Sequence, residues 1–166
     1  MRIPFAQIDA FADQPFAGNP AAVMPLADWL DDATLQAIAA ENNLSETAFI
    51  IPDASGAADF ELRWFTPTAE VALCGHATLA SGHFVLSSEP DATRKGVTFR
   101  TRQAGVLEVS RDGPSYALAL PAWAPTPRDL TAVARALGVD APAETLWHDK
   151  GYALIVAPDA DVVRRS

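Results

Sequence analysis

The stretch between Arg63 and Ala80 predicts a strand, a loop and the start of a helix in direct succession. Polar and apolar residues alternate over residues 60–65, and a Thr-Pro pair ends this strand pattern. The small and apolar residues 77–85 predict a helix that begins at Gly75-His76. The first turn of a helix has unpaired N–H groups and the positive end of the dipole, so an anion can bind there if the entry residue is small. Two hypotheses remain open, an anion-binding helix start or a plain glycine helix start beside a hydrogen-bonded histidine.

The size and charge of the chain exclude several classes of protein. Its 166 residues suffice for one full domain, or for one domain and part of another. A net charge of −9 argues against a nucleic-acid partner, because phosphate binding needs clustered Lys and Arg. No apolar run approaches the roughly 20 residues of a membrane span, and the first residues lack the apolar segment of a signal peptide. We therefore expect a cytoplasmic protein with no membrane partner.

The cysteine and histidine content argues against a metal centre. Cys74 is the single cysteine, which excludes an internal disulfide and any zinc site made of several cysteines. The three histidines, His76, His83 and His148, are scattered and lack metal-ligand spacing. No phosphate loop, dinucleotide glycine pattern or nucleophile elbow is present either. We expect neither a metal nor another cofactor.

The rest of the chain predicts an α+β protein rich in antiparallel sheet, followed by an incomplete second part. The proline-dense segment 121–127 is predicted to be a linker between a first domain, 1–120, and the start of a second, 128–166. That last part buries too little to fold as an independent domain. We expect three helices, one after a cap at Asp31 or Asp32, one from about 77 and one from about 131 to 137. A turn is expected at 158–161. Strands are expected at 3–11, 21–24, 47–51, 60–65, 97–101, 105–110, 116–120 and 152–156.

Glu46 stands at the beginning of the apolar strand predicted over residues 47–51. One hypothesis is an ordinary solvated strand end. The other is a carboxylate partly removed from water, which can both accept and return a proton. The residues around Glu46 do not decide between them.

Three blocks taken together resemble one protein family. Residues 9–23, 43–49 and 63–80 occur in the order and spacing of the PhzF-like (phenazine biosynthesis) isomerase and epimerase proteins. The resemblance is close from residue 2 to about 120 and weaker beyond. Family members are similar to diaminopimelate epimerase. The resemblance implies two similar α+β domains, each a strongly curved, mostly antiparallel sheet wrapped around a central helix, with the active site between them.

The resemblance also implies roles for individual residues. Glu46 would be the general acid/base that moves a proton between carbons of a small carboxylated substrate, either amino-acid-like or dihydro-hydroxyanthranilate-like. His76 and the backbone at Gly75 would hold the substrate, with Ser45 and Asn19 as supporting polar groups, and no cofactor would be needed. Cys74 is assigned a structural role, because it does not stand where the thiols of diaminopimelate epimerase act.

The resemblance further implies that a second domain supplies an acidic residue and a Gly-Ser helix start to the other wall of the site. Neither is found in these residues, so the chain is expected to hold at most half of the site, and activity of these 166 residues alone stays open. One alternative is a non-catalytic protein that binds a small carboxylate at Gly75-His76. Another is a truncated, inactive half of such an enzyme, forming a homodimer through exposed sheet edges.

Overall fold

The computed structural model describes residues 2–88 and 93–166. The chain divides into two compact units, Met1–Leu120 and Pro121–Ser166. Each unit is described by itself below, and the residues of the candidate site all belong to the first.

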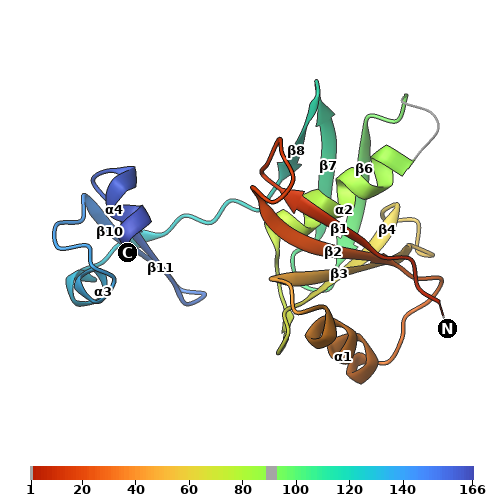
Figure 1. The fold of residues 1–166 in the computed structure, drawn as a ribbon, viewed down its shortest axis with the longest axis horizontal. Helices are drawn as coiled ribbons and strands as arrows, with labels where there is room; N and C mark the ends of the chain where they lie inside the picture. The colour runs from red at the N-terminus through yellow and green to blue at the C-terminus, as the bar shows by residue number, and fades with distance from the viewer. Residues whose placement is uncertain (1, 89–92) are drawn as a thin grey trace. The chain divides into compact units, whose positions relative to one another are not determined.

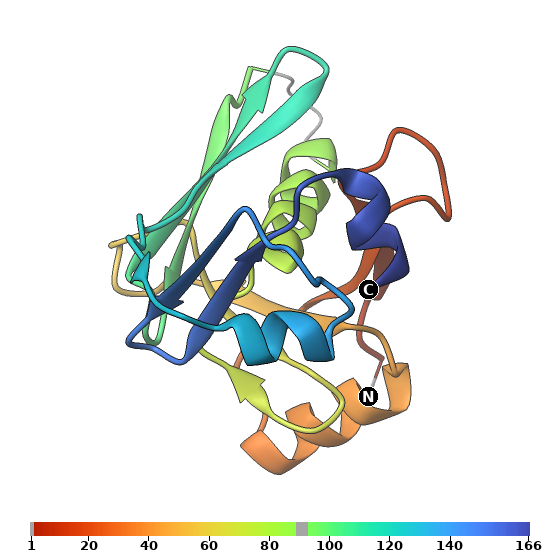
Figure 2. The ribbon, with the colours of Figure 1, turned by 90° about the vertical axis from the view of Figure 1, so that its left-hand side faces the viewer.

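The first unit is a sheet curled around one helix, α2 (Gly75–Ser88), as Figures 1 and 2 show. The strands follow the order β1-β2-β3-β4-β6-β7-β8, and the short β5 pairs with β4. Two neighbouring pairs, β2 with β3 and β4 with β6, are parallel, and the other pairs are antiparallel. The predicted α+β class, with a curved, mostly antiparallel sheet around a central helix, is confirmed. The strand bounds are β1 Ala6–Ala10, β2 Asn19–Pro25, β3 Glu46–Pro52, β4 Phe60–Phe65, β5 Glu70–Val71, β6 Gly96–Thr101, β7 Val106–Asp112 and β8 Ser115–Ala119.

The small residues of α2 allow it to lie inside the sheet. Gly82 contacts β7 so closely that a Cβ atom there would lie 2.4 Å from Val109 Cγ1. The buried hydroxyls of Thr78 and Ser81 donate to carbonyls one turn back, at 2.6 and 2.7 Å, so they bring no unpaired polar group into the core. The helix is thus buried without a continuous apolar stripe.

A second helix, α1 (Asp32–Asn42), packs on the opposite face of the sheet. Successive strand residues point to opposite faces, so Ala48 and Trp64 face α2 while Phe49 and Phe65 face α1. Of the two predicted caps, Asp31 is the N-cap, because its side chain accepts a hydrogen bond from the Thr34 amide.

The second unit, drawn in blue in Figure 2, is a small sheet with two short helices. Its strand order is β11-β10-β9, and part of the predicted linker, Thr126–Pro127, forms β9 against β10. The prediction of a turn at 158–161 was wrong for its last two residues, which begin helix α4. Asp159 caps a short helix there by accepting from the Val162 amide. The elements are β9 Thr126–Pro127, α3 Thr131–Ala136, β10 Glu144–His148, β11 Tyr152–Val156 and α4 Ala160–Arg165. No helix in the described part of the chain is long and apolar enough to cross a membrane.

Candidate active site

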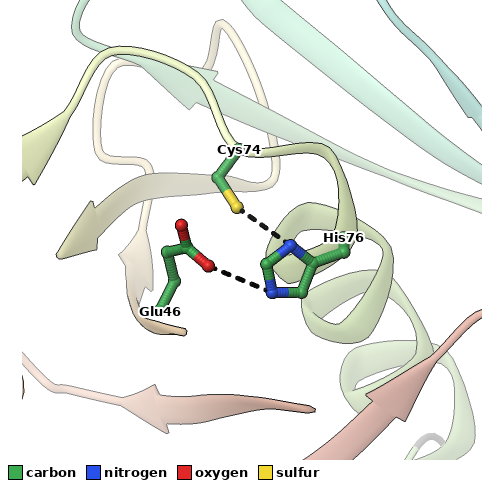
Figure 3. Close-up of side chains that lie close together, drawn as sticks. All are labelled: Glu46, Cys74 and His76. Atoms are coloured by element: carbon green, nitrogen blue, oxygen red, sulfur yellow. Dashed lines mark hydrogen bonds and ion pairs between the residues drawn. The ribbon is translucent and has the colours of Figure 1, made fainter. Parts of the chain in front are cut away.

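The start of β3 and the start of α2 bring Glu46, Cys74 and His76 together (Figure 3). Glu46 is the first residue of β3, His76 is the second residue of α2, and Cys74 directly precedes the helix. The His76 Nε2 atom lies 3.2 Å from Glu46 Oε2, and the His76 Nδ1 atom lies 3.4 Å from Cys74 Sγ. The imidazole ring therefore has the carboxylate on one nitrogen and the thiol on the other.

The contact between Glu46 and His76 is close but incomplete. The side chains are 18% and 10% exposed, and among the described residues neither Glu46 Oε2 nor His76 Nε2 has a hydrogen-bond partner. The 3.2 Å separation lies within ion-pair range, although the geometry is not that of an aligned hydrogen bond. A buried polar atom without a partner typically costs about 1–3 kcal/mol. A ligand group that formed hydrogen bonds with both atoms would remove this cost.

Cys74 enters this cluster as a neutral thiol. Burial, followed by the charge of Glu46, raises the pKa of Cys74 to about 12. A thiol with that pKa is neither a nucleophile nor a base near neutral pH. It retains its proton and acts as a weak hydrogen-bond donor.

Two more predicted site residues, Asn19 and Ser45, contact each other beside the cluster. The strands β2 and β3 are parallel, with Ala21 opposite Glu46, so both strands begin at the same edge of the sheet. The Ser45 hydroxyl donates to Asn19 Oδ1 at 3.1 Å. No hydrogen bond links this pair to Glu46 or His76 within residues 2–88 and 93–166.

Gly75 begins α2, as predicted, but its packing does not require glycine. A Cβ atom there would meet only Leu120 Cδ1 at 3.5 Å and Leu118 Cδ2 at 4.0 Å, which are ordinary contacts. Close approach of a ligand to this backbone therefore stays a prediction.

Glu46, Cys74 and His76 are also chemically able to bind a metal ion. One ligand atom from each residue lies within 4.8 Å of the others. However, the thiol and the carboxylate face different ring nitrogens, so binding one ion by all three residues requires a side chain to turn. The thiol would also have to lose its proton. Sequence spacing could not reveal this cluster, because Glu46 comes from a different element.

Arg63 is a residue whose role the sequence did not predict. Its guanidinium contacts the Glu70 carboxylate of β5 at 2.8 and 2.7 Å and Asp32 of α1 at 2.8 Å. The strand β5 leads directly into the segment that bears Cys74 and His76. Arg63 thus fixes the position of β5, the strand that precedes Cys74 and His76 in the chain.

Comparison with known proteins agrees with this architecture. The sequence profile of PhzC-PhzF, described as phenazine biosynthesis-like protein, matches residues 8–145. An uncharacterized isomerase of Pseudomonas aeruginosa is 50% identical over 157 residues, which are 94% of this chain and 58% of that protein. The human phenazine biosynthesis-like domain-containing protein is 43% identical over 138 residues, 80% of this chain and 47% of its own length. A PhzF family structure from Enterococcus faecalis superposes with a TM-score of 0.82 and 39% identity, covering 98% of this chain and 60% of that one.

A curled, mostly antiparallel sheet around a central helix is the fold of diaminopimelate epimerase-like proteins. The chain belongs to the PhzF-like family of phenazine biosynthesis-like proteins. The names of its relatives support an isomerase-type function for the family. The chain spans 58% and 60% of the length of two uncharacterized isomerases of Pseudomonas aeruginosa and 47% of the length of the human protein.

Proposed function

We propose that the full-length protein is a cofactor-independent isomerase or epimerase in which Glu46 is the general acid/base. It would move a proton between carbons of a small carboxylated substrate, amino-acid-like or dihydro-hydroxyanthranilate-like. The observation that carries the proposal is the largely buried Glu46 Oε2, which has no hydrogen-bond partner among the described residues and faces His76 at the start of α2.

The chemistry needs one group that removes a proton from carbon and returns it to another carbon. A carboxylate in a largely water-free position can do both. His76 and the amides at Gly75 would bind the substrate carboxylate, and the helix dipole contributes typically ~0.3–1 kcal/mol to that contact. Fixing the carboxylate holds the reacting carbon near Glu46, which is the main requirement of a single-base reaction. Ser45 and Asn19 would support the substrate from the neighbouring strand ends.

Proton transfer in D2O tests this proposal on the full-length protein. Amino acids and dihydro-hydroxyanthranilate-type acids are incubated with enzyme, and deuterium entering the carbon positions is followed by NMR. Glu46→Gln should reduce the exchange by about 10²–10⁴-fold, the usual contribution of a general acid/base. Glu41→Gln, at an exposed carboxylate of α1, is the matched control. Full exchange by the Glu46→Gln variant would show that another group moves the proton.

A non-catalytic carboxylate-binding protein is the second candidate. It is favoured by the same unpartnered His76 Nε2 atom, which could bind an anion without any chemistry. Calorimetric titration of the 166-residue chain with the same acids separates the two functions. A pure binding protein loses affinity in His76→Ala but not in Glu46→Gln, and it catalyses no deuterium exchange at any chain length.

A further inference from the structure

We infer that Cys74 is a positioning residue, whose S–H group donates to His76 Nδ1 and thereby holds the ring proton on Nε2, facing Glu46. The inference rests on the proposed function only in that Glu46 acts there as the general acid/base. Its structural content, the tautomer of His76, can be measured without any substrate.

The first step of the argument is the placement of the thiol. Cys74 Sγ lies 3.4 Å from His76 Nδ1, and both residues are at least nine-tenths buried. A cysteine thiol ordinarily has a pKa of about 8.5, so it bears its proton at neutral pH and can donate it to a hydrogen bond. A neutral imidazole has one donor nitrogen and one acceptor nitrogen. If Nδ1 accepts from the thiol, Nε2 must bear the hydrogen.

The second step concerns the other ring nitrogen. Glu46 Oε2 lies 3.2 Å from His76 Nε2, and a carboxylate oxygen is only an acceptor. The opposite tautomer would place a nitrogen lone pair against this carboxylate and an N–H group against sulfur, a weak acceptor. The two contacts therefore favour the same tautomer independently of each other.

The third step is what this tautomer does in the site. A hydrogen on Nε2 gives the site a donor that faces Glu46 and any substrate carboxylate bound beside it. The Nε2–Oε2 contact is not an aligned hydrogen bond, so this donor is not fully used by Glu46. Cys74 would touch no substrate and would act through His76 alone.

The thiol has one competing acceptor, which makes the inference falsifiable. The Glu46 carboxylate is near enough to raise the pKa of Cys74 both by its charge and by a hydrogen bond with the thiol. If the thiol donates to Glu46 instead, removing the thiol leaves the His76 ring unaffected. The two arrangements thus predict different spectra.

The experiment is a long-range ¹H–¹⁵N NMR correlation on the ¹⁵N-labelled 166-residue chain at slightly alkaline pH. The spectrum reports which ring nitrogen of each histidine bears hydrogen, and His76→Gln assigns the His76 signals. We expect the Nε2–H form for His76. In Cys74→Ala the His76 Nδ1 signal should shift, and Cys74→Ser, which restores a donor, should return it toward the wild-type position. The His83 and His148 signals are internal controls and should not move.

A wild-type spectrum with hydrogen on Nδ1 would overturn the inference, even if no variant folds. An unchanged His76 signal in folded Cys74→Ala would overturn it as well, because the thiol would then only fill space or bind Glu46. Failure of the proposed function gives a different result, since retained exchange by Glu46→Gln says nothing about the tautomer.

Discussion

The guanidinium of Arg63 holds the carboxylate of Glu70 with two hydrogen bonds, 2.8 Å from Nε and 2.7 Å from Nη2. Arg63 is 3% exposed and lies over the rings of Trp29 and Phe65. Its charge is therefore surrounded by aromatic rings and carboxylates instead of water. This pair joins β4 to β5, and β5 leads into the helix start that bears His76.

Replacing Arg63 with Met should lower the free energy of unfolding by about 2–4 kcal/mol, because it leaves Glu70 without its buried partner. Arg63→Lys should lose less stability than Arg63→Met, because it retains the positive charge. It should still be less stable than the wild type, because lysine cannot form both hydrogen bonds with Glu70. The control is Arg102→Met, which removes a half-exposed partner of the same Glu70 carboxylate and should cost under about 1 kcal/mol. Urea unfolding measures all three variants, and equal losses at Arg63 and Arg102 would contradict the prediction.

Cys74 should make the protein sensitive to alkali. Its pKa is raised from 9.0 to about 12, first by burial, so the folded state retains a proton that the unfolded chain has lost. The unfolded state then binds fewer protons above pH 9, and stability falls as pH rises from there toward 12. Three pKa units correspond to at most about 4 kcal/mol.

Serine does not titrate in this range, so Cys74→Ser should remove this part of the alkaline loss. Urea unfolding of both proteins at pH 7, 9 and 10.5 provides the test, because the titration of Lys and Tyr residues cancels in the difference. Parallel stability curves for the two proteins would show that the thiol is not the source.

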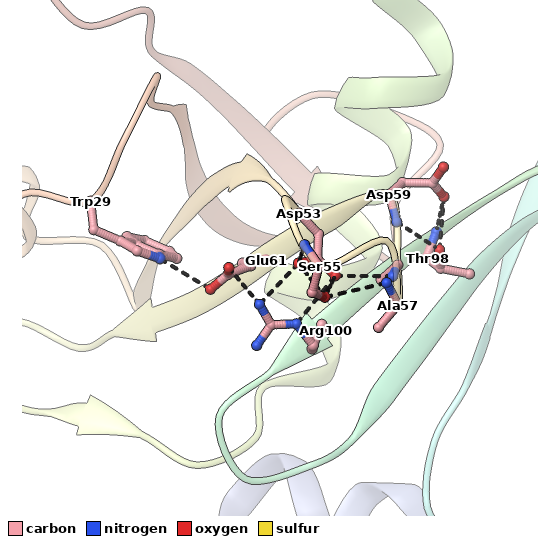
Figure 4. Close-up of polar contacts among 9 residues, drawn as sticks. Trp29, Asp53, Ser55, Ala57, Asp59, Glu61, Thr98 and Arg100 are labelled. Atoms are coloured by element: carbon pink, nitrogen blue, oxygen red, sulfur yellow. Dashed lines mark hydrogen bonds and ion pairs between the residues drawn. The ribbon is translucent and has the colours of Figure 1, made fainter.

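Asp53 should contribute the opposite pH dependence. Its fully buried side chain accepts hydrogen bonds from Arg100, Ser55 and Ala58, as Figure 4 shows for the group around Arg100. The Arg100 hydrogen bond first, and then those from Ser55 and the backbone, hold the pKa of Asp53 far below its ordinary value of 3.8. A carboxylate of this kind stabilises the fold above its unfolded pKa and loses that contribution as pH falls through the folded pKa.

Asp53→Asn should therefore be less stable at pH 7 and should lose less stability than the wild type between pH 4 and pH 2. Arg100→Gln should flatten the acid curve in the same way, since it removes the hydrogen bond that lowers the pKa of Asp53 most. Ser55→Ala removes only a hydroxyl and should retain most of the acid dependence. Thermal unfolding across this pH range is the measurement, and an acid curve of wild-type steepness in Asp53→Asn would refute the assignment.

The sequence predicted those parts of the site that are local in the chain. The strand, loop and helix start around Gly75-His76 follow from periodicity and turn residues, and Glu46 stands out as a carboxylate before an apolar strand. The distance between Glu46 and His76 could not be predicted from spacing. It depends on the register of β2 with β3 and on α2 lying inside the curled sheet.

Strands β5 and β9 have 2 residues each, too few to show a period of polar and apolar positions, and the sequence missed both. Helix α4 was missed because its N-cap, Asp159, stands in a segment whose proline and aspartates predict a turn. The thiol contact with His76 likewise gives no sequence signal, because a buried cysteine beside a glycine is ordinary. In the sequence Arg63 is only a polar position of an alternating strand, whereas in the structure it binds carboxylates of two other elements.

Gly82 should be the position where the smallest added group does the most harm. A Cβ atom there would lie 2.4 Å from Val109 Cγ1 and 2.5 Å from Val109 Cβ, well inside contact distance. Alanine favours a helix over glycine by about 1 kcal/mol, but overpacking costs typically about 1–3 kcal/mol. Val109 Cβ is fixed to the strand backbone and no rotamer moves it, so α2 would have to shift away from β7.

We expect Gly82→Ala to lose at least about 1–2 kcal/mol in urea unfolding. Val109→Ala in that background should recover only part, because alanine retains its Cβ. Ser87→Ala, at the exposed end of the same helix, should change stability by less than about 0.5 kcal/mol. A Gly82→Ala protein as stable as Ser87→Ala would mean that the helix does not approach the sheet this closely.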